Sequence, residues 1–180
     1  MHKPSPQNSN SQSIDAVLNA DQKALDDAVI LIEDSGSLSA NENAHLLAKK
    51  LGLQVHTIPY GSSSKGSKLK PYAAAQWQLV FKEEGLSLRV ASEPSWSDIR
   101  VDFCSEALQY RKLHGGGRNE SVAKAIGIKG KQSLKVLDCT AGMGTDSFIM
   151  ASVGAHVTLI ERSSIISALL SDALQRANQA

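Results

Sequence analysis

The sequence predicts an α/β protein in which a small α+β domain precedes the start of a doubly wound domain with a parallel sheet. The central observation is a short apolar run that ends in Asp138 and is followed by a turn containing Gly142 and Gly144. A helical pattern comes next, and a second apolar run leads to Glu161, nineteen residues after Gly142. Strand, glycine turn, helix, strand and acid in this order are typical of a nucleotide-type cofactor site.

Composition, charge and cysteine content limit the remaining possibilities. The 180 residues are 42% hydrophobic, enough for a globular core, and a net charge of +1 gives no overall field that attracts nucleic acid or membrane. Residues 1–25 begin with a polar segment that lacks the apolar part of a signal peptide, and they are predicted to form a disordered tail. Cys104 and Cys139 are predicted to be reduced, buried thiols of a cytoplasmic protein. No membrane or metal partner is predicted.

Residues 26–104 are predicted to form the small α+β domain. Apolar strand patterns alternate there with one helical pattern that ends at Gly52, and a hairpin follows around the turn at residues 83–85. The expected elements are a strand at 28–32, a helix at 41–51, a strand at 53–56, a loop at 61–70, hairpin strands at 77–81 and 86–90, and a short strand at 99–102.

Residues 105–180 are predicted to begin the cofactor domain. Helical patterns cover 105–114 and 119–126, and glycines end both. The stretch from Arg111 to Lys135 holds seven basic residues against the single acid Glu120. This concentration indicates a phosphate-binding face, and solvated helix ends are the ordinary alternative. The elements expected beyond these helices are the strand ending at 138, a helix at 146–153, a strand at 157–160 and an amphipathic helix at 164–177.

The glycine turn has the chemistry that a bound cofactor needs. Gly142 and Gly144 lack a Cβ, so the backbone can come close to a ligand. The helix after them directs free N–H groups at the turn. Glu161, at the end of the next strand, can accept hydrogen bonds from the hydroxyls of a ribose. A tight turn followed by a solvated glutamate is the alternative that needs no ligand.

Two positions in this segment bear on the identity of the cofactor. A dinucleotide fingerprint requires a third glycine where Ser147 stands, so a nicotinamide cofactor is disfavoured. Asp138 stands four residues before Gly142, and an acid followed by Ala-Gly-x-Gly resembles motif I of S-adenosylmethionine-dependent methyltransferases. That resemblance implies S-adenosyl-L-methionine as the cofactor, with the glycine turn near its methionine part and Glu161 on its ribose.

Several motifs occur in a fixed order between residues 101 and 174. They are Arg111-Lys112-Leu113-His114-Gly115-Gly116-Gly117-Arg118, Ala123-Lys124-Ala125-Ile126-Gly127-Ile128-Lys129-Gly130, the turn from Asp138 to Phe148, Ala151-Ser152-Val153-Gly154 and Glu161-Arg162. The set resembles the ribosomal RNA small subunit methyltransferase J family. The resemblance implies a Rossmann-like class I methyltransferase domain that methylates the exocyclic N2 of a guanosine in 16S ribosomal RNA. The implied partner is that RNA or the small ribosomal subunit.

The resemblance also implies the residues of the cofactor site. Contacts are expected at Thr145 and Asp146 in the turn, and at Glu161 and Arg162 after the second strand. Asp146 could face the ammonium group of the cofactor or cap its own helix, and Arg162 could cover the adenine edge or be solvated. Asp138 is expected to orient the turn through hydrogen bonds.

The expected RNA-binding residues are Arg111, Lys112 and Arg118, which would hold phosphates. Enzymes of the resembled type carry an Asp/Asn-Pro-x-aromatic motif that holds the target amine, and no such motif occurs in the sequence. The catalytic residues are therefore expected beyond Ala180, and the 180 residues are expected to be part of a longer protein and inactive alone. A nicotinamide-dependent oxidoreductase and an RNA-binding module without catalysis are the alternative functions.

Overall fold

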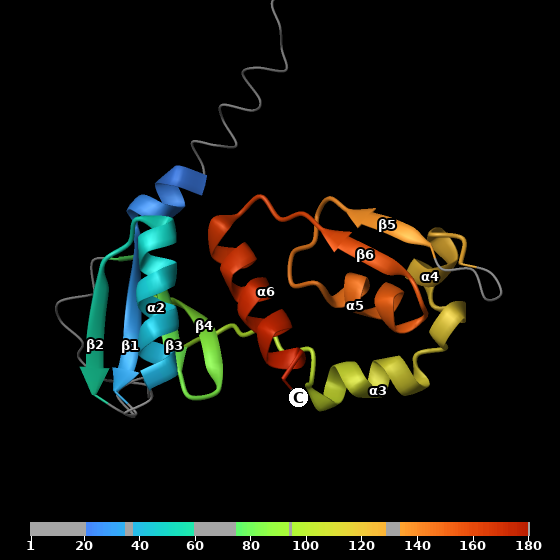
Figure 1. Cartoon of the computed structure of the whole chain (residues 1–180), viewed down its shortest axis with the longest axis horizontal. Helices are drawn as coiled ribbons and strands as arrows, with labels where there is room; N and C mark the ends of the chain where they lie inside the picture. Colours follow the sequence, from blue (N-terminus) through green and yellow to red (C-terminus); the bar gives the residue numbers. More distant parts are fainter. Residues whose placement is uncertain (1–20, 35–37, 60–74, 94, 129–133, 180) are drawn as a thin grey trace, which may run out of the picture.

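The structure, a computed structural model, describes residues 21–34, 38–59, 75–93, 95–128 and 134–179. It contains one four-stranded and one two-stranded sheet, and helix α6 (Ser164–Ala177) lies between them in Figure 1. The predicted loop at 61–70 lies outside the described residues, and so does the predicted tail up to residue 20. Residues 21–26, at the end of that predicted tail and just after it, are helical.

The first sheet has the strand order β2-β1-β3-β4, in which β1 is parallel to both β2 and β3. The β1 strand is apolar throughout its centre because both of its faces are buried: Ile30 and Ile32 face one core cluster, and Val29 and Leu31 face another. The predicted strand at 99–102 is reduced to an isolated bridge between Ile99 and Leu88. The elements of this part are β1 (Ala28–Asp34), α2 (Leu38–Leu51), β2 (Val55–Pro59), β3 (Trp77–Lys82) and β4 (Gly85–Val90).

The second sheet confirms the predicted parallel βαβ arrangement. Its strands β5 and β6 are parallel and are connected by helix α5, so their carboxyl ends meet at one edge, where Asp138 is paired with Leu159. Helix α3 runs along the lower side of this part in Figure 1 and leads into two short helical turns. The elements are α3 (Glu106–His114), η2 (Gly117–Asn119), α4 (Ser121–Ala125), β5 (Lys135–Asp138), α5 (Thr145–Ser152) and β6 (His156–Leu159).

Helix α6 joins the two parts through a shared core. Its Leu169 and Leu170 belong to the same buried cluster as Ile30 of β1 and Leu79 of β3. The inner face of the four-stranded sheet is therefore covered by α6 as well as by α2, and a sheet face buried in this way is stabilised by both halves of the chain. The mixed α/β class is confirmed, and a domain boundary near residue 104 stays a prediction.

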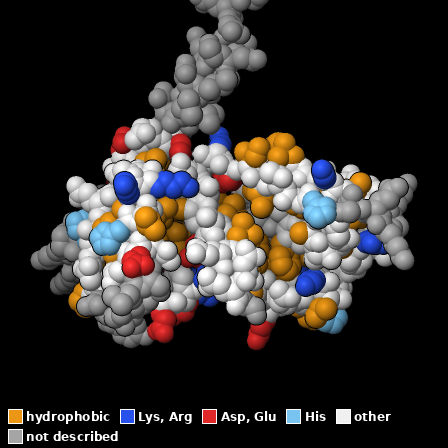
Figure 2. All heavy atoms as spheres, viewed as in Figure 1, with side chains coloured by type: hydrophobic (Ala, Val, Ile, Leu, Met, Phe, Trp, Pro, Cys, Tyr) orange, Lys and Arg blue, Asp and Glu red, His pale blue; other side chains and the backbone are white. Residues whose placement is uncertain are grey.

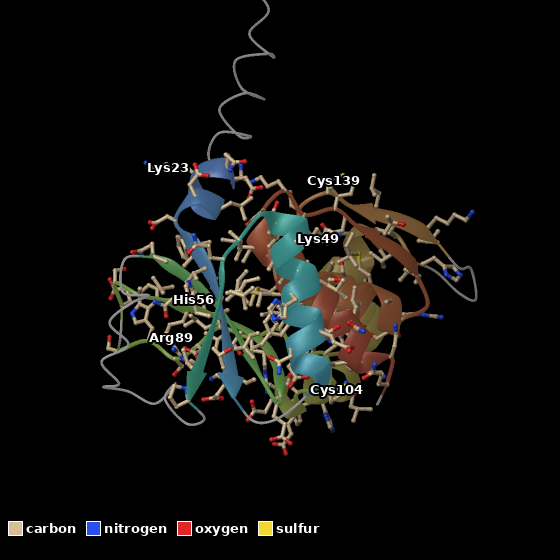
Figure 3. The ribbon with its side chains drawn as sticks, turned by 60° about the vertical axis from the view of Figure 1, so that its left-hand side comes forward. Lys23, Lys49, His56, Arg89, Cys104 and Cys139 are labelled. Carbon is tan, nitrogen blue, oxygen red and sulfur yellow. The ribbon has the colours of Figure 1, made fainter. Side chains whose placement is uncertain are left out.

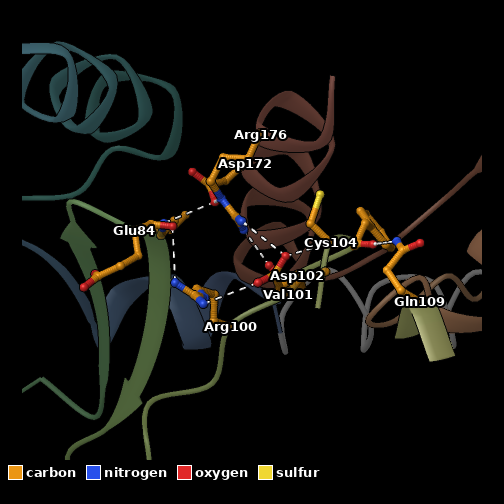
Figure 4. A network of polar contacts seen from close by, with 10 residues as sticks. Glu84, Arg100, Val101, Asp102, Cys104, Gln109, Asp172 and Arg176 are labelled. Atoms are coloured by element: carbon orange, nitrogen blue, oxygen red, sulfur yellow. Dashed lines mark hydrogen bonds and ion pairs between the residues drawn. The ribbon is translucent and has the colours of Figure 1, made fainter. Parts of the chain in front are cut away.

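A polar network fixes the hairpin and the following segment against α6 (Figure 4). Arg176 of α6 donates to Asp172 at 2.8 Å and to the carbonyl oxygen of Val101 at 2.5 Å. The Asp172 carboxylate also accepts the backbone N–H of Leu86 at 3.1 Å. Asp102, on the same segment as Val101, accepts the backbone N–H of Cys104 at 2.9 Å. These bonds hold the segment that enters α3 in a fixed place beside α6.

The surface differs from the sequence prediction at the two cysteines. Cys104 and Cys139 are both free and exposed, so the prediction of buried thiols was wrong; they lie far apart in Figure 3. Cys104 lies two residues before the first residue of helix α3, and Cys139 begins the turn after β5, so neither lies within a packed element. On the face in Figure 2, apolar side chains gather in the middle of the molecule, while basic side chains are scattered.

Candidate functional site

The turn between β5 and α5 contains two glycines with different physical requirements. Both have a positive φ, 51° for Gly142 and 72° for Gly144, which favours glycine. A Cβ on Gly142 would meet nothing closer than the carbonyl oxygen of Thr140, at 3.9 Å. A Cβ on Gly144 would lie 2.8 Å from Leu170 Cδ2 and 2.9 Å from Phe103 Cζ. Gly142 therefore leaves open space for a ligand, whereas Gly144 is required by the packing of the core beneath the turn.

Asp138 holds the turn through two hydrogen bonds. Its carboxylate accepts the backbone N–H of Thr140 at 3.0 Å and the hydroxyl of Ser147 at 2.5 Å. Ser147 is only 3% exposed, and it occupies the position at which a dinucleotide fingerprint has its third glycine. The hydroxyl of Ser147, which stands in place of that glycine, thus orients Asp138. This geometry supports the orienting role expected for Asp138.

Glu161 connects the ends of the two strands. One carboxylate oxygen accepts the backbone N–H of Gly142 at 2.8 Å, and the other accepts the backbone N–H of Ser163 at 2.8 Å. Ser163 is the N-cap of α6, so the same carboxylate steadies the glycine turn and the start of that helix. A carboxylate oxygen has two lone pairs, and each oxygen of Glu161 therefore keeps capacity to accept one further hydrogen bond.

Asp146 faces helix α3 instead of capping its own helix. The N-cap of α5 is Gly144, which forms no side-chain cap bond, and the Asp146 side chain is 64% exposed. Its carboxylate accepts a hydrogen bond from Arg111 at 3.2 Å. Of the two roles left open by the sequence, capping is not observed, and contact with the ammonium group of the cofactor stays a prediction.

Glu120 also belongs to this arrangement, although its position in the sequence indicates only a single acid among basic residues. Its two carboxylate oxygens share the single N–H of Arg111 Nε, at 3.3 and 3.1 Å, and one of them also accepts from Nη2 at 2.7 Å. The hydrogen bond to Glu120 is the main cause that raises the pKa of Arg111 above its ordinary value. Arg111 is therefore a charged link between Glu120 and Asp146, and its Nε and Nη2 already have acidic partners.

Two hollows flank the turn. One of about 500 Å³ lies between α4 and β5 and includes Asp138, Thr145 and Asp146 in its lining. The other, of about 410 Å³, lies between the segment from Arg100 to Leu108 and the turn, and it also includes Thr145. The structure thus brings Thr145 and Asp146 together with Asp138 at a concave surface. Gly142 and Glu161 meet at the adjacent strand edge, outside the lining of both hollows.

The remaining predicted residues are exposed. Arg162 follows Glu161 on the surface, and Lys112 and Arg118 lie on α3 and η2. Lys112 Nζ is 6.0 Å from the centre of the Phe148 ring. Within the part of the chain that the structure describes, no three His, Cys, Asp or Glu side chains are grouped closely enough to hold a metal ion. No helix among these residues is long and apolar enough to cross a membrane.

Parallel strands joined through a glycine turn and a helix, with an acid at or just after the end of each strand, define the class of Rossmann-like cofactor-binding proteins. The family described as "Putative SAM-dependent methyltransferase" matches residues 64–180, where SAM is S-adenosylmethionine. The chain belongs to this family. S-adenosylmethionine is accordingly the cofactor, and the open space at Gly142 together with the remaining acceptor capacity of Glu161 fits a ligand that carries a ribose.

Individual relatives agree with this assignment. A ribosomal RNA small subunit methyltransferase J from Pseudoalteromonas atlantica is 43% identical over 136 residues, which are 69% of this chain and 53% of that protein. The protein of the same name from Aeromonas salmonicida is 47% identical over 113 residues, 63% of this chain and 45% of that protein. The crystal structure of a SAM-dependent methyltransferase from Neisseria gonorrhoeae matches with a TM-score of 0.53 and 31% identity, over 84% of this chain and 53% of that one. The chain spans about half the length of the curated relatives it matches.

Proposed function

We propose that the protein transfers a methyl group from S-adenosylmethionine to the exocyclic N2 of a guanosine in 16S ribosomal RNA, in the cytoplasm. The observation that carries the proposal is the Glu161 carboxylate, which bonds the N–H of Gly142 and so fixes a second-strand acid against the glycine turn. The names of the relatives, which are small subunit ribosomal RNA methyltransferases, support the RNA substrate.

The proposed cofactor contacts follow the geometry of the turn. Glu161 accepts hydrogen bonds from the ribose hydroxyls with the lone pairs that the backbone leaves free. Asp146 pairs with the ammonium group, because its carboxylate is exposed and only one of its oxygens is bonded to Arg111. Thr145 lines the same hollow, and Arg162 covers the adenine edge from the surface after β6.

When bound, S-adenosylmethionine would supply a methyl group activated by its positively charged sulfur: the guanine N2 would bond to the methyl carbon as the carbon–sulfur bond breaks, S-adenosylhomocysteine would leave, and the methylated amine would lose one proton to water. The residues of this chain contribute orientation: Asp138, Ser147 and Glu161 hold the turn in one conformation. The target base has to leave its stack to reach the cofactor. On the RNA side, Lys112 and Arg118 hold phosphates, while Arg111 acts by fixing α3 beside Asp146.

The two alternatives differ from this proposal in ways that can be measured. A nicotinamide enzyme would need the close helix approach that a third glycine permits, whereas Ser147 fills that position with a hydroxyl bonded to Asp138. An RNA-binding module without catalysis would bind the RNA and leave it unmethylated.

The test is methyl transfer from tritiated S-adenosylmethionine to small-subunit ribosomal RNA and to assembled subunits, followed by nucleoside analysis. It uses a protein of the full length of the curated relatives that contains this chain, because the chain spans about half of that length. The proposal predicts label in N2-methylguanosine, and a strong loss of label with Glu161→Gln. Glu83→Gln is the matched control, because Glu83 is an exposed acid in the β3–β4 turn, far along the chain from the site. Absence of label, or label on another atom, contradicts the proposal.

A further inference from the structure

The end of helix α3 carries an exposed pair of aromatic rings. The rings of Tyr110 and His114 are stacked, with centroids 4.2 Å apart and planes inclined by 23°. His114 Nδ1 lies 3.2 Å from the carbonyl oxygen of Tyr110, which ties the imidazole to the helix end. The residues are one helical turn apart, so the helix itself sets their spacing.

The fold does not use these rings for packing. Helix α3 has no buried residue, and Tyr110 is 66% exposed. The contacts of α3 with the rest of the molecule come from other positions: Leu108 packs against the main core, and Gln109 donates to the carbonyl oxygen of Phe103 at 2.8 Å. A Tyr side chain usually buries its large apolar surface, so a ring left this open is available for a partner.

The structure changes the charge expected around the rings. In the sequence Glu120 is the acid that offsets the bases of this segment, but in the structure its carboxylate is taken by Arg111. The basic side chains that remain exposed on α3, η2 and α4 are those of Lys112, Arg118 and Lys124, and the exposed acid of these elements, Glu106, lies at the opposite end of α3 from His114. Within the described residues, none of these three forms an ion pair with an acid. The segment that carries the rings thus has three exposed basic side chains without an ion pair among the described residues.

The position of α3 places this surface beside the cofactor turn. Arg111, which follows Tyr110 in the chain, reaches Asp146 at the start of α5. A polyanion held at the end of α3 would therefore pass next to the hollows that flank the turn.

We propose that Tyr110 and His114 form a stacking platform for an unpaired base of the RNA substrate, and that Lys112, Arg118 and Lys124 hold the neighbouring phosphates. This inference rests on the proposed function, because it concerns the RNA of that reaction. Stacked aromatic rings on a segment with basic side chains suit single-stranded RNA, because its unpaired nucleobases present flat faces and its backbone is anionic. An acidic peptide would match the charge but offers no planar partner for the rings.

The test compares three variants in binding a single-stranded oligonucleotide that carries 2-aminopurine, a base whose fluorescence falls on stacking. Tyr110→Ala should weaken binding about 5- to 100-fold, the range typical when a stacking aromatic is lost, and should abolish the quenching. Tyr110→Phe should retain both because the ring is kept. Leu113→Ala is the matched control, since Leu113 is 74% exposed on the same helix and has no ring.

The basic residues have a separate readout. Lys112→Ala and Arg118→Ala should each lower the slope of log affinity against log salt by roughly 0.7, the value for one phosphate contact to a single strand, while Tyr110→Ala should leave that slope unchanged. S-adenosylhomocysteine affinity should stay constant in all variants, which shows that the cofactor site is intact.

Three outcomes would overturn the platform. Tyr110→Ala could bind RNA as the wild type does, Leu113→Ala could lose as much affinity, or polyglutamate could compete as well as RNA, which would make the surface a general anion site. If the wild type binds S-adenosylhomocysteine but binds neither RNA nor polyglutamate, the RNA substrate of the proposed function fails and the platform fails with it. If it binds and methylates RNA while Tyr110→Ala does so equally well, only the platform fails.

Discussion

Replacing the two glycines of the cofactor turn one at a time separates ligand access from core packing. Gly142 and Gly144 lie two residues apart and both have positive φ, so an alanine at either position pays a similar conformational cost of about 1–2 kcal/mol. The surroundings differ. The new methyl group of Gly142→Ala would have no neighbour closer than 3.9 Å, whereas that of Gly144→Ala would be 2.8 Å from Leu170 and 2.9 Å from Phe103.

The expected magnitudes follow from these surroundings. Gly144→Ala adds overpacking, typically about 1–3 kcal/mol, to the conformational cost, because Leu170 is buried and Phe103 is stacked on Phe148. The expected loss of unfolding free energy is therefore about 2–5 kcal/mol for Gly144→Ala and about 1–2 kcal/mol for Gly142→Ala. For cofactor affinity the order is reversed: the methyl of Gly142→Ala occupies the open space and should weaken binding by about tenfold or more, which is about 1.4 kcal/mol.

The assays are urea unfolding for stability and titration calorimetry with S-adenosylhomocysteine for affinity, on both variants and the wild type. Temperatures are chosen at which each variant is folded. The reasoning is refuted if Gly142→Ala binds S-adenosylhomocysteine as tightly as the wild type, or if it is destabilised as strongly as Gly144→Ala.

Two further predictions concern stability. Ser147→Ala removes the buried hydroxyl that donates to Asp138 at 2.5 Å, and urea unfolding should show a loss of about 1.5–3 kcal/mol; a loss below 0.5 kcal/mol would mean that the bond does not hold the turn. Asp98 titrates differently from a free carboxyl: burial raises its pKa, but hydrogen bonds from Arg89 and Lys82 outweigh burial and lower the pKa below its ordinary 3.8. Because the folded-state pKa is lowered, the stabilisation by the Asp98 carboxylate is present above about pH 3.8 and is lost as the pH falls through the folded-state pKa. The difference in unfolding free energy between wild type and Asp98→Asn should therefore shrink as the pH falls below about 3.8 and stay constant from about pH 5 to 7.

The sequence predicted the local structure well where the pattern was strong. The helix expected at 164–177 is observed at Ser164–Ala177, because its apolar stripe is regular and Ser163 caps its first turn. The parallel strands around the glycine turn could also be predicted, because the residues of the turn and the apolar strand patterns lie close together in the chain.

What the sequence could not supply depends on contacts between distant residues. Nothing in the local pattern indicates that α6 covers the first sheet. The pattern also does not indicate that Arg111 donates a hydrogen bond to Asp146, which lies 35 residues later in the chain. The different roles of Gly142 and Gly144 depend on Leu170 and Phe103, which approach only one of the two. Arg111 was expected to contact RNA, but it is paired with Glu120 and Asp146 within the protein. The exposed positive charge of the segment is carried by Lys112, Arg118 and Lys124 instead.

The measurement that tests the central claim most directly is a calorimetric titration of the protein with S-adenosylhomocysteine and, separately, with NADH. We expect binding of S-adenosylhomocysteine alone. Glu161→Gln should weaken it by about 1–3 kcal/mol, the cost of losing a charged acceptor, while Glu83→Gln leaves it unchanged. Preferential binding of NADH, or an S-adenosylhomocysteine affinity that does not respond to Glu161→Gln, would contradict the assignment of the glycine turn and Glu161 as the cofactor site.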